Sequence, residues 1–402
     1  MAKLQVQDLS IQGKRVLVRV DFNVPQNKDG SISDDTRIRE SLPTIQYIID
    51  QGGIPILMSH SGRPKGKKDP RYSLALCAKA LSNLLRIPVI FAPDCIGNET
   101  EKLAKSASEG QIILLENLRF YAAEEDPKSD PSFAQKLASL GDLYVNDAFG
   151  SAHRAHSSTV QIAAFFPGRA ASGLLMQKEI AFLNTSLSSP KRPFYAIIGG
   201  AKISTKIGVL QSLLSKVDAL FVGGGMAYTL FKAQGISIGD SIFEAEQLKV
   251  AQDFLLAASK KNIPLFLPTD LVIASAFTAD APNKVIDIKE GIPEGWQGMD
   301  IGPKTIEIWN KALQKGATIF WNGPVGVFEF PAFAKGTDAL ARTLSTLKAI
   351  TIAGGGDSVA AINKLGLKNK FSHLSTGGGA SLEYIELGHL PGIDALSNRQ
   401  LV

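Results

Sequence analysis

The sequence predicts an α/β protein with two Rossmann-like, doubly wound parallel-sheet domains joined by a hinge helix. Short runs of β-branched and aliphatic residues alternate with segments of helical periodicity along the whole chain, which is typical of parallel α/β structure. The chain has 402 residues, so two or three packed units are expected. Eleven strand-like runs exceed the eight of a β/α barrel and favour two open sheets.

Five strands are predicted in the first half of the chain. Each is a short apolar run followed by polar or glycine residues, as expected for a buried parallel strand. They are residues 15–20, 54–59, 88–91, 112–115 and 143–145. The amphipathic run 74–85 is long enough to be one of the crossover helices that parallel strands require.

Six strands are predicted in the second half by the same pattern, with 247–259 as a crossover helix. They are residues 194–198, 219–222, 264–267, 318–321, 350–353 and 371–375. The boundary between the halves is expected where the helical run 174–183 leads into the polar stretch TSLSSPKRP, because a helix followed by such a stretch can act as a hinge. The predicted domains are 1–172 and 193–389, with the hinge helix and linker at 173–192.

Composition excludes several classes of protein. A hydrophobic content of 45% with 20% charged residues indicates a folded chain. No apolar run reaches the length of a membrane span, and the start MAKLQVQDLS does not resemble a signal peptide, so a cytoplasmic location without membrane contact is expected. The net charge of +5 is evenly spread, which disfavours a nucleic-acid partner. Cys77 and Cys95 are too few for a disulfide framework.

The strand ends of the first half carry several arginine and histidine side chains. Ligands bind beyond the carboxyl ends of the strands in open parallel sheets, and Arg37 follows the first strand in the segment DDTRIRE. Arginine suits carboxylate and phosphate groups, so these positions predict an anion-binding cleft, although any single arginine could be solvated or salt-bridged. The other basic side chains at these strand ends are His60, Arg63, Arg119, His153, Arg154 and His156.

The strand ends of the second half are rich in glycine. Glycine lets backbone N–H groups approach phosphate oxygens, and a helix start adds its dipole, so this half is predicted to bind a nucleotide; tight turns are the alternative reading. The P-loop, the G-x-G-x-x-G fingerprint and the protein-kinase motifs are all missing. The glycine-rich stretches are 199–206, 223–225, 322–324, 354–358 and 376–379.

Ten motifs in this order resemble the phosphoglycerate kinase family. The resemblance runs from about Arg15 to Glu383, and Ser61 departs from it, since the family usually has an aliphatic residue before Gly-Arg-Pro. The motifs are VDFNVP, DDTRIRESLPTI, SHSGRP, ENLRF, NDAFGSAHRAHSS, GGAKISTKI, GGGMAYTL, WNGPVGVFE, AGGGDS and STGGGASLE.

The resemblance implies reversible phosphoryl transfer between 1,3-bisphosphoglycerate and ADP, giving 3-phosphoglycerate and ATP with Mg²⁺. It also implies a monomer whose tail, residues 390–402, returns to the first domain. The residues implied for phosphoglycerate binding are Asp21, Asn23, Arg37, His60, Ser61, Gly62, Arg63, Arg119 and Arg154. Those implied for the nucleotide are Lys202, Lys206, Gly298, Asn322, Glu329 at the ribose, Gly355, Gly356, Asp357 at the metal, and Ser358.

The chemistry of the residues is compatible with this reaction. A carboxylate nucleophile is ionised at neutral pH and needs no general base, so cations, backbone donors and a metal suffice. We expect Arg37, Lys206, Mg²⁺ and the helix start at Gly378 and Gly379 to stabilise the transferring group after hinge closure. Two other classes fit the sequence less well. An oxidoreductase should carry a dinucleotide fingerprint, which is missing here, and an anion or nucleic-acid binder would leave the glycine-rich half without a role.

Overall fold

The computed structural model describes residues 2–27 and 29–399. The α/β class is confirmed, since the described residues form two six-stranded parallel sheets and one three-stranded antiparallel sheet. The chain divides into two compact units: the first contains the residues up to Ala181 and those from Leu387 onward, and the second is Phe182–Glu386. Residues 1, 28 and 400–402, which the predicted domain ranges include, lie outside the described part.

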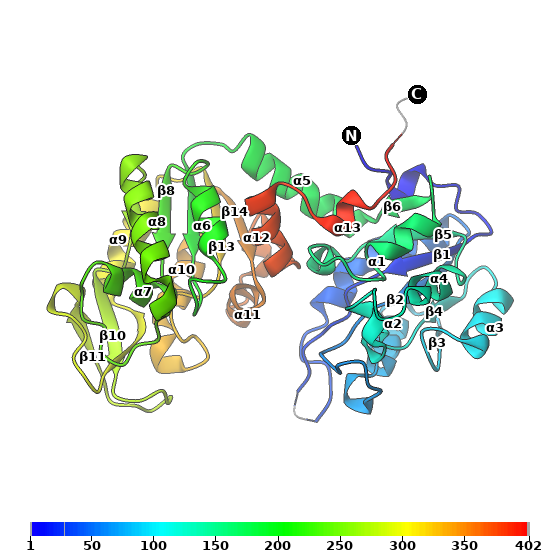
Figure 1. Ribbon diagram of the computed structural model, residues 1–402, viewed down its shortest axis with the longest axis horizontal. Coiled ribbons are helices and arrows are strands. Elements are labelled where there is room, and N and C mark those ends of the chain that lie inside the picture. Colours follow the sequence, from blue (N-terminus) through cyan, green and yellow to red (C-terminus); the bar gives the residue numbers. More distant parts are fainter. Residues whose placement is uncertain (1, 28, 400–402) are drawn as a thin grey trace. The chain divides into compact units, whose positions relative to one another are not determined.

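The first unit is built on a parallel sheet with strand order β3-β4-β2-β1-β5-β6 (Figure 1). Central strands carry apolar residues on both faces because helices cover both faces of a parallel sheet. The strands are β1 (Arg15–Arg19), β2 (Ile54–Met58), β3 (Val89–Phe91), β4 (Ile112–Leu114), β5 (Leu143–Asn146) and β6 (Ala170–Ser172).

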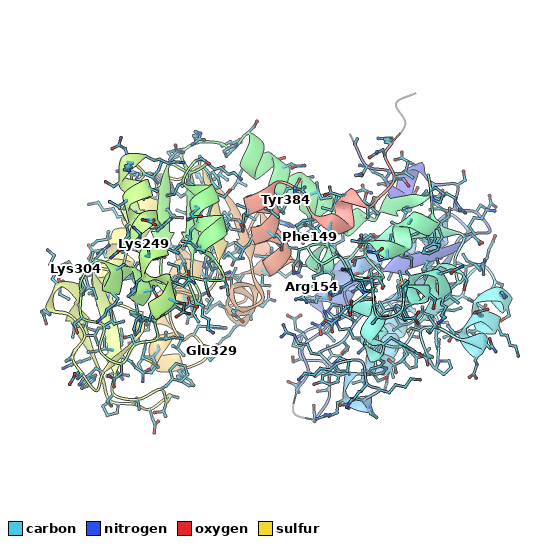
Figure 2. The ribbon with its side chains drawn as sticks, in the orientation of Figure 1. Phe149, Arg154, Lys249, Lys304, Glu329 and Tyr384 are labelled. Carbon is cyan, nitrogen blue, oxygen red and sulfur yellow. The ribbon has the colours of Figure 1, made fainter. Side chains whose placement is uncertain are left out.

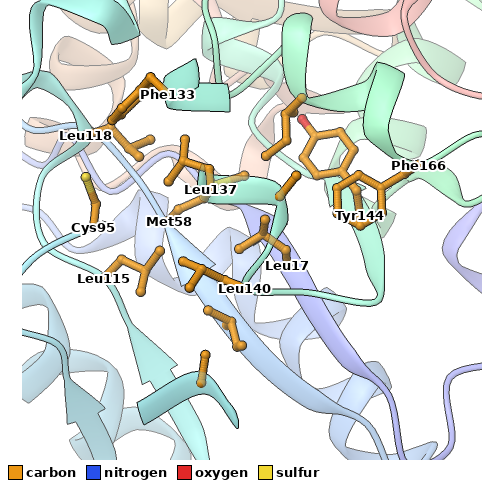
Figure 3. Packing of buried hydrophobic residues seen from close by; sticks show 14 of the residues in the cluster. Leu17, Met58, Cys95, Leu115, Leu118, Phe133, Leu137, Leu140, Tyr144 and Phe166 are labelled. Carbon is orange, nitrogen blue, oxygen red and sulfur yellow. The ribbon is translucent and has the colours of Figure 1, made fainter. Parts of the chain in front are cut away.

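Two hydrophobic cores fill the faces of this sheet. Val16 and Val18 of β1 pack with helices α1 (Thr36–Asp50) and α2 (Ala75–Leu85). Leu17 points to the opposite face, since side chains alternate along a strand, and packs with α3 (Asn98–Ser106) and α4 (Ser132–Ala138). Figure 3 shows this second core around Leu17, Met58 and Tyr144.

The second unit contains a parallel sheet with strand order β15-β14-β13-β7-β8-β9. Buried residues on its two faces form separate cores, one with α6, α7, α8 and α12 and one with α9, α10 and α11. The strands are β7 (Phe194–Ile198), β8 (Ala219–Val222), β9 (Leu265–Phe266), β13 (Thr318–Asn322), β14 (Ile350–Gly354) and β15 (His373–Leu374). The helices are α6 (Ile207–Leu213), α7 (Met226–Ala233), α8 (Leu248–Lys260), α9 (Pro303–Leu313), α10 (Lys335–Thr346), α11 (Gly356–Lys364) and α12 (Gly378–Leu387).

The prediction of eleven strands is wrong, because the described residues contain fifteen. The missed strands are β6 and the antiparallel sheet of β10 (Asp270–Ala274), β11 (Asn283–Asp287) and β12 (Gln297–Ile301). β6 reads Ala-Ala-Ser, β11 is largely exposed, and β12 contains a glycine, so these three lack the continuous apolar run that indicates a buried strand.

Helix α5 (Leu174–Ser188) spans the division between the two units. The buried carboxylate of Asp147 accepts hydrogen bonds at Oδ1 from the backbone N–H groups of Leu175 and Met176 at 2.9 and 3.2 Å, which caps the first turn. The chain after α12 returns to the first unit through α13 (Pro391–Asp394), where the amide of Asn146 donates to the Gly392 carbonyl at 3.2 Å.

The other helical segments of the described residues are short 3₁₀ helices. They are Val6–Asp8, Pro70–Tyr72, Leu118–Phe120, Ala122–Glu124, Phe149–Ser151, Gln161–Phe165, Ala245–Gln247, Ile288–Glu290, Pro331–Phe333 and Lys368–Lys370.

None of the helices described is both long and apolar enough to cross a membrane.

Candidate active site

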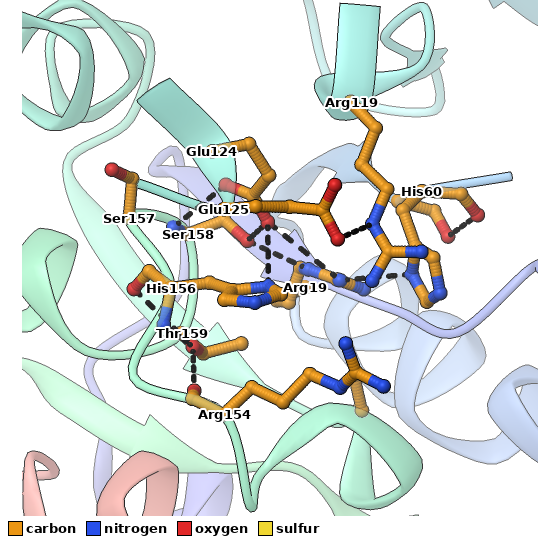
Figure 4. Close-up of polar contacts among 12 residues, drawn as sticks. Arg19, His60, Arg119, Glu124, Glu125, Arg154, His156, Ser157, Ser158 and Thr159 are labelled. Atoms are coloured by element: carbon orange, nitrogen blue, oxygen red, sulfur yellow. Dashed lines mark hydrogen bonds and ion pairs between the residues drawn. The ribbon is translucent and has the colours of Figure 1, made fainter. Parts of the chain in front are cut away.

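Cationic side chains of the first unit gather where β1, β2, β4 and β5 end, as the strand-end reading predicts. Figure 4 shows the guanidinium groups of Arg19, Arg119 and Arg154 in one region with the imidazoles of His60 and His156. We call the four cations Arg19, Arg37, Arg119 and Arg154, together with the imidazoles of His60 and His156, the cationic cluster.

Asp21 and Arg37 form an ion pair at the edge of this cluster. Arg37 lies in the first turn of α1, and its guanidinium is 2.8 Å from Oδ1 of Asp21. Burial by itself raises the pKa of Asp21, but the positive charges of Arg37 and Arg19 lower it to about 2. The pair therefore keeps Asp21 ionised and holds the guanidinium of Arg37 at the sheet edge.

Asn23, Gly62 and Arg119 are joined through the backbone of Gly62. The Gly62 N–H donates to Oδ1 of Asn23 at 2.8 Å, and its carbonyl accepts from Arg119 at 2.8 Å. Gly62 has φ +58°, and a Cβ there would lie 2.2 Å from the ring of Tyr72, so only glycine fits. Arg119 is also 3.1 Å from Glu125, and the Asn117 amide donates to the Ser61 carbonyl at 2.7 Å.

The sequence-based prediction missed a buried network next to His60, formed by Arg19, Ser158 and Glu124. Arg19 is 1% exposed; its Nε donates to the Ser158 hydroxyl at 2.9 Å, and another of its nitrogens lies 4.0 Å from Glu124. Oε1 of Glu124 accepts from the Ser158 hydroxyl at 2.6 Å. The position of Arg19 at the end of a buried strand could have indicated a buried partner, since arginine is almost never buried unless it is paired.

The three histidines of this region are held neutral. Burial, together with neighbouring arginines, lowers the pKa of His60 well below its usual value, and burial and Arg19 lower that of His156 to about 3. Burial also lowers the pKa of His153. Positive charge at this edge therefore comes from the arginines, while the imidazoles serve as hydrogen-bonding groups.

Of the arginines predicted at the strand ends, Arg63 and Arg154 have no carboxylate partner among the described residues, whereas Arg37 and Arg119 are paired. Arg63 is exposed. Arg154 is half-buried, and its Nε contacts only the His153 ring, at 3.3 Å. Uncompensated guanidinium groups favour an external anion.

The second unit contains a pocket of about 380 Å³ at the glycine-rich strand ends. Aromatic and aliphatic side chains give it apolar walls, and a Cβ on Gly298 would lie 2.1 Å from the Tyr228 hydroxyl. Of the predicted nucleotide residues, Gly298, Glu329 and Asp357 line the pocket, and Figure 2 marks Glu329. Sequence reasoning missed the other side chains of the wall, among them Tyr228, Ile242, Phe277, Gln297 and Met299.

Lys206 and Asn322 meet beside the start of α12. Nζ of Lys206 donates to Oδ1 of Asn322 at 2.7 Å, and the Asn322 amide lies 3.5 Å from the Gly378 carbonyl. Burial lowers the pKa of Lys206 to about 8, while the negative charge of Asp357 acts in the opposite direction. Lys206 is therefore a partly buried cation.

The helix starts of α11 and α12 approach each other through glycines. Gly355 has φ +95°, and a Cβ on Gly378 would lie 2.4 Å from the Gly355 Cα. Asp357 is exposed in the first turn of α11, whereas the buried Ser358 hydroxyl accepts from the Gly323 N–H at 2.7 Å and so holds a turn. Lys202 is exposed and lies outside the lining of the pocket.

Comparison with known proteins gives one family. The family model described as phosphoglycerate kinase matches residues 6–387. A phosphoglycerate kinase from Moorella thermoacetica is 52% identical over 99% of this chain and 100% of its own length. Two plant relatives are also 52% identical: one from Triticum aestivum named cytosolic, covering 97% of this chain and 96% of the relative, and one from Arabidopsis thaliana named chloroplastic, covering 98% and 83%.

Solved structures agree with this result. The structure of phosphoglycerate kinase from Coxiella burnetii has a TM-score of 0.83 and 41% sequence identity, and 98% of each chain is covered. The family match and these relatives span nearly the whole chain and therefore include both units. The chain belongs to the phosphoglycerate kinase family.

Proposed function

We propose that the cationic cluster binds the phosphoglycerate substrate and that the glycine-lined pocket binds the nucleotide. The family's reaction is the reversible transfer of a phosphoryl group between 1,3-bisphosphoglycerate and ADP, a step of glycolysis, which yields 3-phosphoglycerate and ATP. The enzyme is thus a kinase with a carboxyl group as acceptor. Each ligand would be held by a different unit of the chain.

The observation that carries this assignment is that two of the arginines at the strand ends lack an internal counter-charge. Arg63 and Arg154 have no carboxylate partner in the described chain, and the imidazoles beside them are neutral. A substrate with a phosphate and a carboxylate supplies the missing negative charge. The residues proposed to hold it are Asp21, Asn23, Arg37, His60, Ser61, Gly62, Arg63, Arg119 and Arg154.

On the nucleotide side, apolar walls and glycine backbone suit a purine base and its phosphates. Glu329 lines the pocket and is proposed to bind the ribose hydroxyls. The residues proposed for the phosphates and the rest of the nucleotide are Lys202, Lys206, Gly298, Asn322, Gly355, Gly356, Asp357 and Ser358.

In the direction of ATP consumption, a carboxylate oxygen of 3-phosphoglycerate attacks the γ-phosphorus. The new O–P bond forms as the bond from this phosphorus to the β–γ bridging oxygen breaks, and the electron pair leaves with ADP. No proton must be removed from the nucleophile, and His60 and His156 would be weak bases because their pKa values are lowered. Arg37, Lys206 and the backbone N–H groups of Gly378 and Gly379 are proposed to stabilise the charge on the transferring oxygens.

Asp357 is the residue proposed to hold Mg²⁺ together with the nucleotide phosphates. Its carboxylate is exposed and lines the pocket, and the described residues contain no cluster of three or more His, Cys, Asp or Glu that could hold a metal without them. One carboxylate plus phosphate oxygens is a normal ligand set for Mg²⁺. When bound, the ion neutralises phosphate charge.

Because the reactants are assigned to different units, we propose that ligand binding brings the two together by hinge closure. Small-angle scattering tests this: the radius of gyration should fall in the ternary complex, and an unchanged value would refute closure. A cytoplasmic monomer is proposed as well. Light scattering and cell fractionation test these two statements.

The activity itself is tested by trapping the acyl phosphate with hydroxylamine after incubation with 3-phosphoglycerate and Mg-ATP. Product should require both substrates and disappear with EDTA. A folded protein that binds ADP but forms no product would refute the proposed reaction.

A further inference from the structure

The strongest unassigned feature is the contact between Arg19 and His60 inside the cationic cluster. The guanidinium of Arg19 lies 3.1 Å from Nδ1 of His60, and the two residues are 1% and 6% exposed. Guanidinium nitrogens only donate hydrogen bonds and do not lose their protons in proteins. Nδ1 of His60 must therefore be the acceptor in this contact.

This contact decides which nitrogen of His60 carries the proton. A neutral imidazole has one N–H, so an accepting Nδ1 leaves the proton on Nε2. The charged groups around the ring are Asp21, Arg19, Arg119 and Arg37. The three arginines and the burial of the ring disfavour the imidazolium, which could not accept from Arg19 in any case.

Arg19 is itself held in place by the rest of the network. Its Nε donates to the Ser158 hydroxyl, whose own proton goes to Glu124, and a further N–H donates to the Val20 carbonyl. The guanidinium is thus fixed on several sides, and its negative counterpart, Glu124, is fully buried at 4.0 Å. The position of the Arg19 donor toward His60 does not depend on solvent.

We propose that Arg19 is a positioning residue: it locks His60 as the neutral Nε2–H tautomer and so makes His60 a hydrogen-bond donor to the anionic substrate. The donor role rests on the proposed binding of phosphoglycerate at this cluster. Arg19 would act through His60, without contacting the substrate. An Nε2 without a proton would instead present a lone pair to an anion, which is repulsive.

Nitrogen NMR on the full chain labelled at histidine tests the tautomer without any substrate. Long-range proton–nitrogen correlation distinguishes the protonated from the unprotonated ring nitrogen. His60 should show a protonated Nε2 and a bare Nδ1 from pH 6 to pH 8. A protonated Nδ1, or a charged ring at neutral pH, would overturn the proposal.

The variant Arg19→Lys tests the cause, because it keeps the charge but removes the fixed fork. The Nε2–H signature of His60 should be replaced by a mixture of tautomers, and the KM for 3-phosphoglycerate should rise about 10-fold, as for the loss of one hydrogen bond to a charged group. Arg15→Lys is the matched control, since Arg15 starts the same strand and pairs with Asp142 at 2.7 Å, outside the cluster. It should change neither value.

Two outcomes separate this proposal from the proposed function. If the wild-type enzyme turns over 3-phosphoglycerate but saturating substrate leaves the Nε2 signal unmoved, the donor role of His60 is wrong. If no turnover occurs, the proposed function fails, and the locked tautomer is then judged by the substrate-free spectrum alone. Should Arg19→Lys fail to fold, His60→Gln keeps an N–H donor where His60→Leu does not, and equal KM values for these two variants would overturn the donor role.

Discussion

The close approach of Gly378 to Gly355 makes Gly378→Ala a sharp test of the proposed phosphate-binding role of the helix starts in the second unit. The added Cβ would lie 2.4 Å from the Gly355 Cα and 2.8 Å from its N, whereas ordinary contacts begin at 3.4 Å. Both partners are backbone, so no flexible side chain can move aside. The starts of α11 and α12 must therefore separate by about 1 Å.

A displacement of this size should affect activity more than stability. A misplacement of about 1 Å in a positioned group can lower the rate by about 100-fold, and overpacking a dense site costs about 1–3 kcal/mol of unfolding free energy. The Asn322 amide lies 3.5 Å from the Gly378 carbonyl, so the shift also disturbs the contact of Asn322 with Lys206.

Two quantities are measured for each variant: kcat for phosphoryl transfer from ATP to 3-phosphoglycerate, and the midpoint of urea unfolding followed by circular dichroism. Gly356→Ala is the matched control for stability, because its added Cβ meets nothing within 4 Å and it lies at the first residue of α11; its stability should be unchanged or up to about 1 kcal/mol higher. Wild-type kcat in Gly378→Ala, with an unfolding midpoint equal to that of the control, would refute the reasoning.

Three further predictions follow from the ionisable groups. The kcat/KM for the nucleotide should fall as pH rises through about 8, because Lys206 then loses its charge, and Lys206→Arg should move this limb out of range; a flat wild-type profile would contradict it. Burial raises the pKa of Asp147 to about 7, so the folded chain holds a proton that the unfolded chain, with a pKa of about 3.9, releases. The free energy of unfolding should therefore fall as the pH rises from about 4 to about 7, and it should fall more steeply in the wild type than in Asp147→Asn. Urea midpoints measured across this range test the prediction, and parallel curves for the two proteins would refute it. Arg37→Ala should lower kcat by about 100-fold. Arg39→Ala should leave kcat unchanged, because Arg39 is exposed on the same helix and pairs with Asp35, outside the cationic cluster.

Local sequence was sufficient for the strands that are buried on both faces. The predicted strands 194–198 and 219–222 coincide with β7 and β8 to the residue, because a continuous apolar run between glycine or polar residues leaves few other structures open to it. The antiparallel sheet was missed for the opposite reason. Its strand β11 is exposed at three of five positions, so pairing with β10 rather than apolar periodicity makes it a strand.

The site also has a part that the sequence predicts and a part that it does not. Strand-end position by itself predicts that Arg119 and Arg154 lie in one region, as Figure 4 shows, because the carboxyl ends of parallel strands meet at one edge of the sheet. The partners of these residues could not be read in this way. Arg19 meets Glu124, which is 105 positions away in the chain, and the two are brought together only by packing between β1 and the segment after β4.

By itself, the sequence determined the fold class, the family and the residue types at each strand end, since these depend on local periodicity and on ordered motifs along the chain. Only the tertiary structure decided which charges are compensated and which remain available to a ligand. Asp21 is ionised by Arg37, His60 is neutral beside Arg19, and Lys206 has a lowered pKa. Protonation depends on burial and on neighbours in space, which the order of residues along the chain does not reveal.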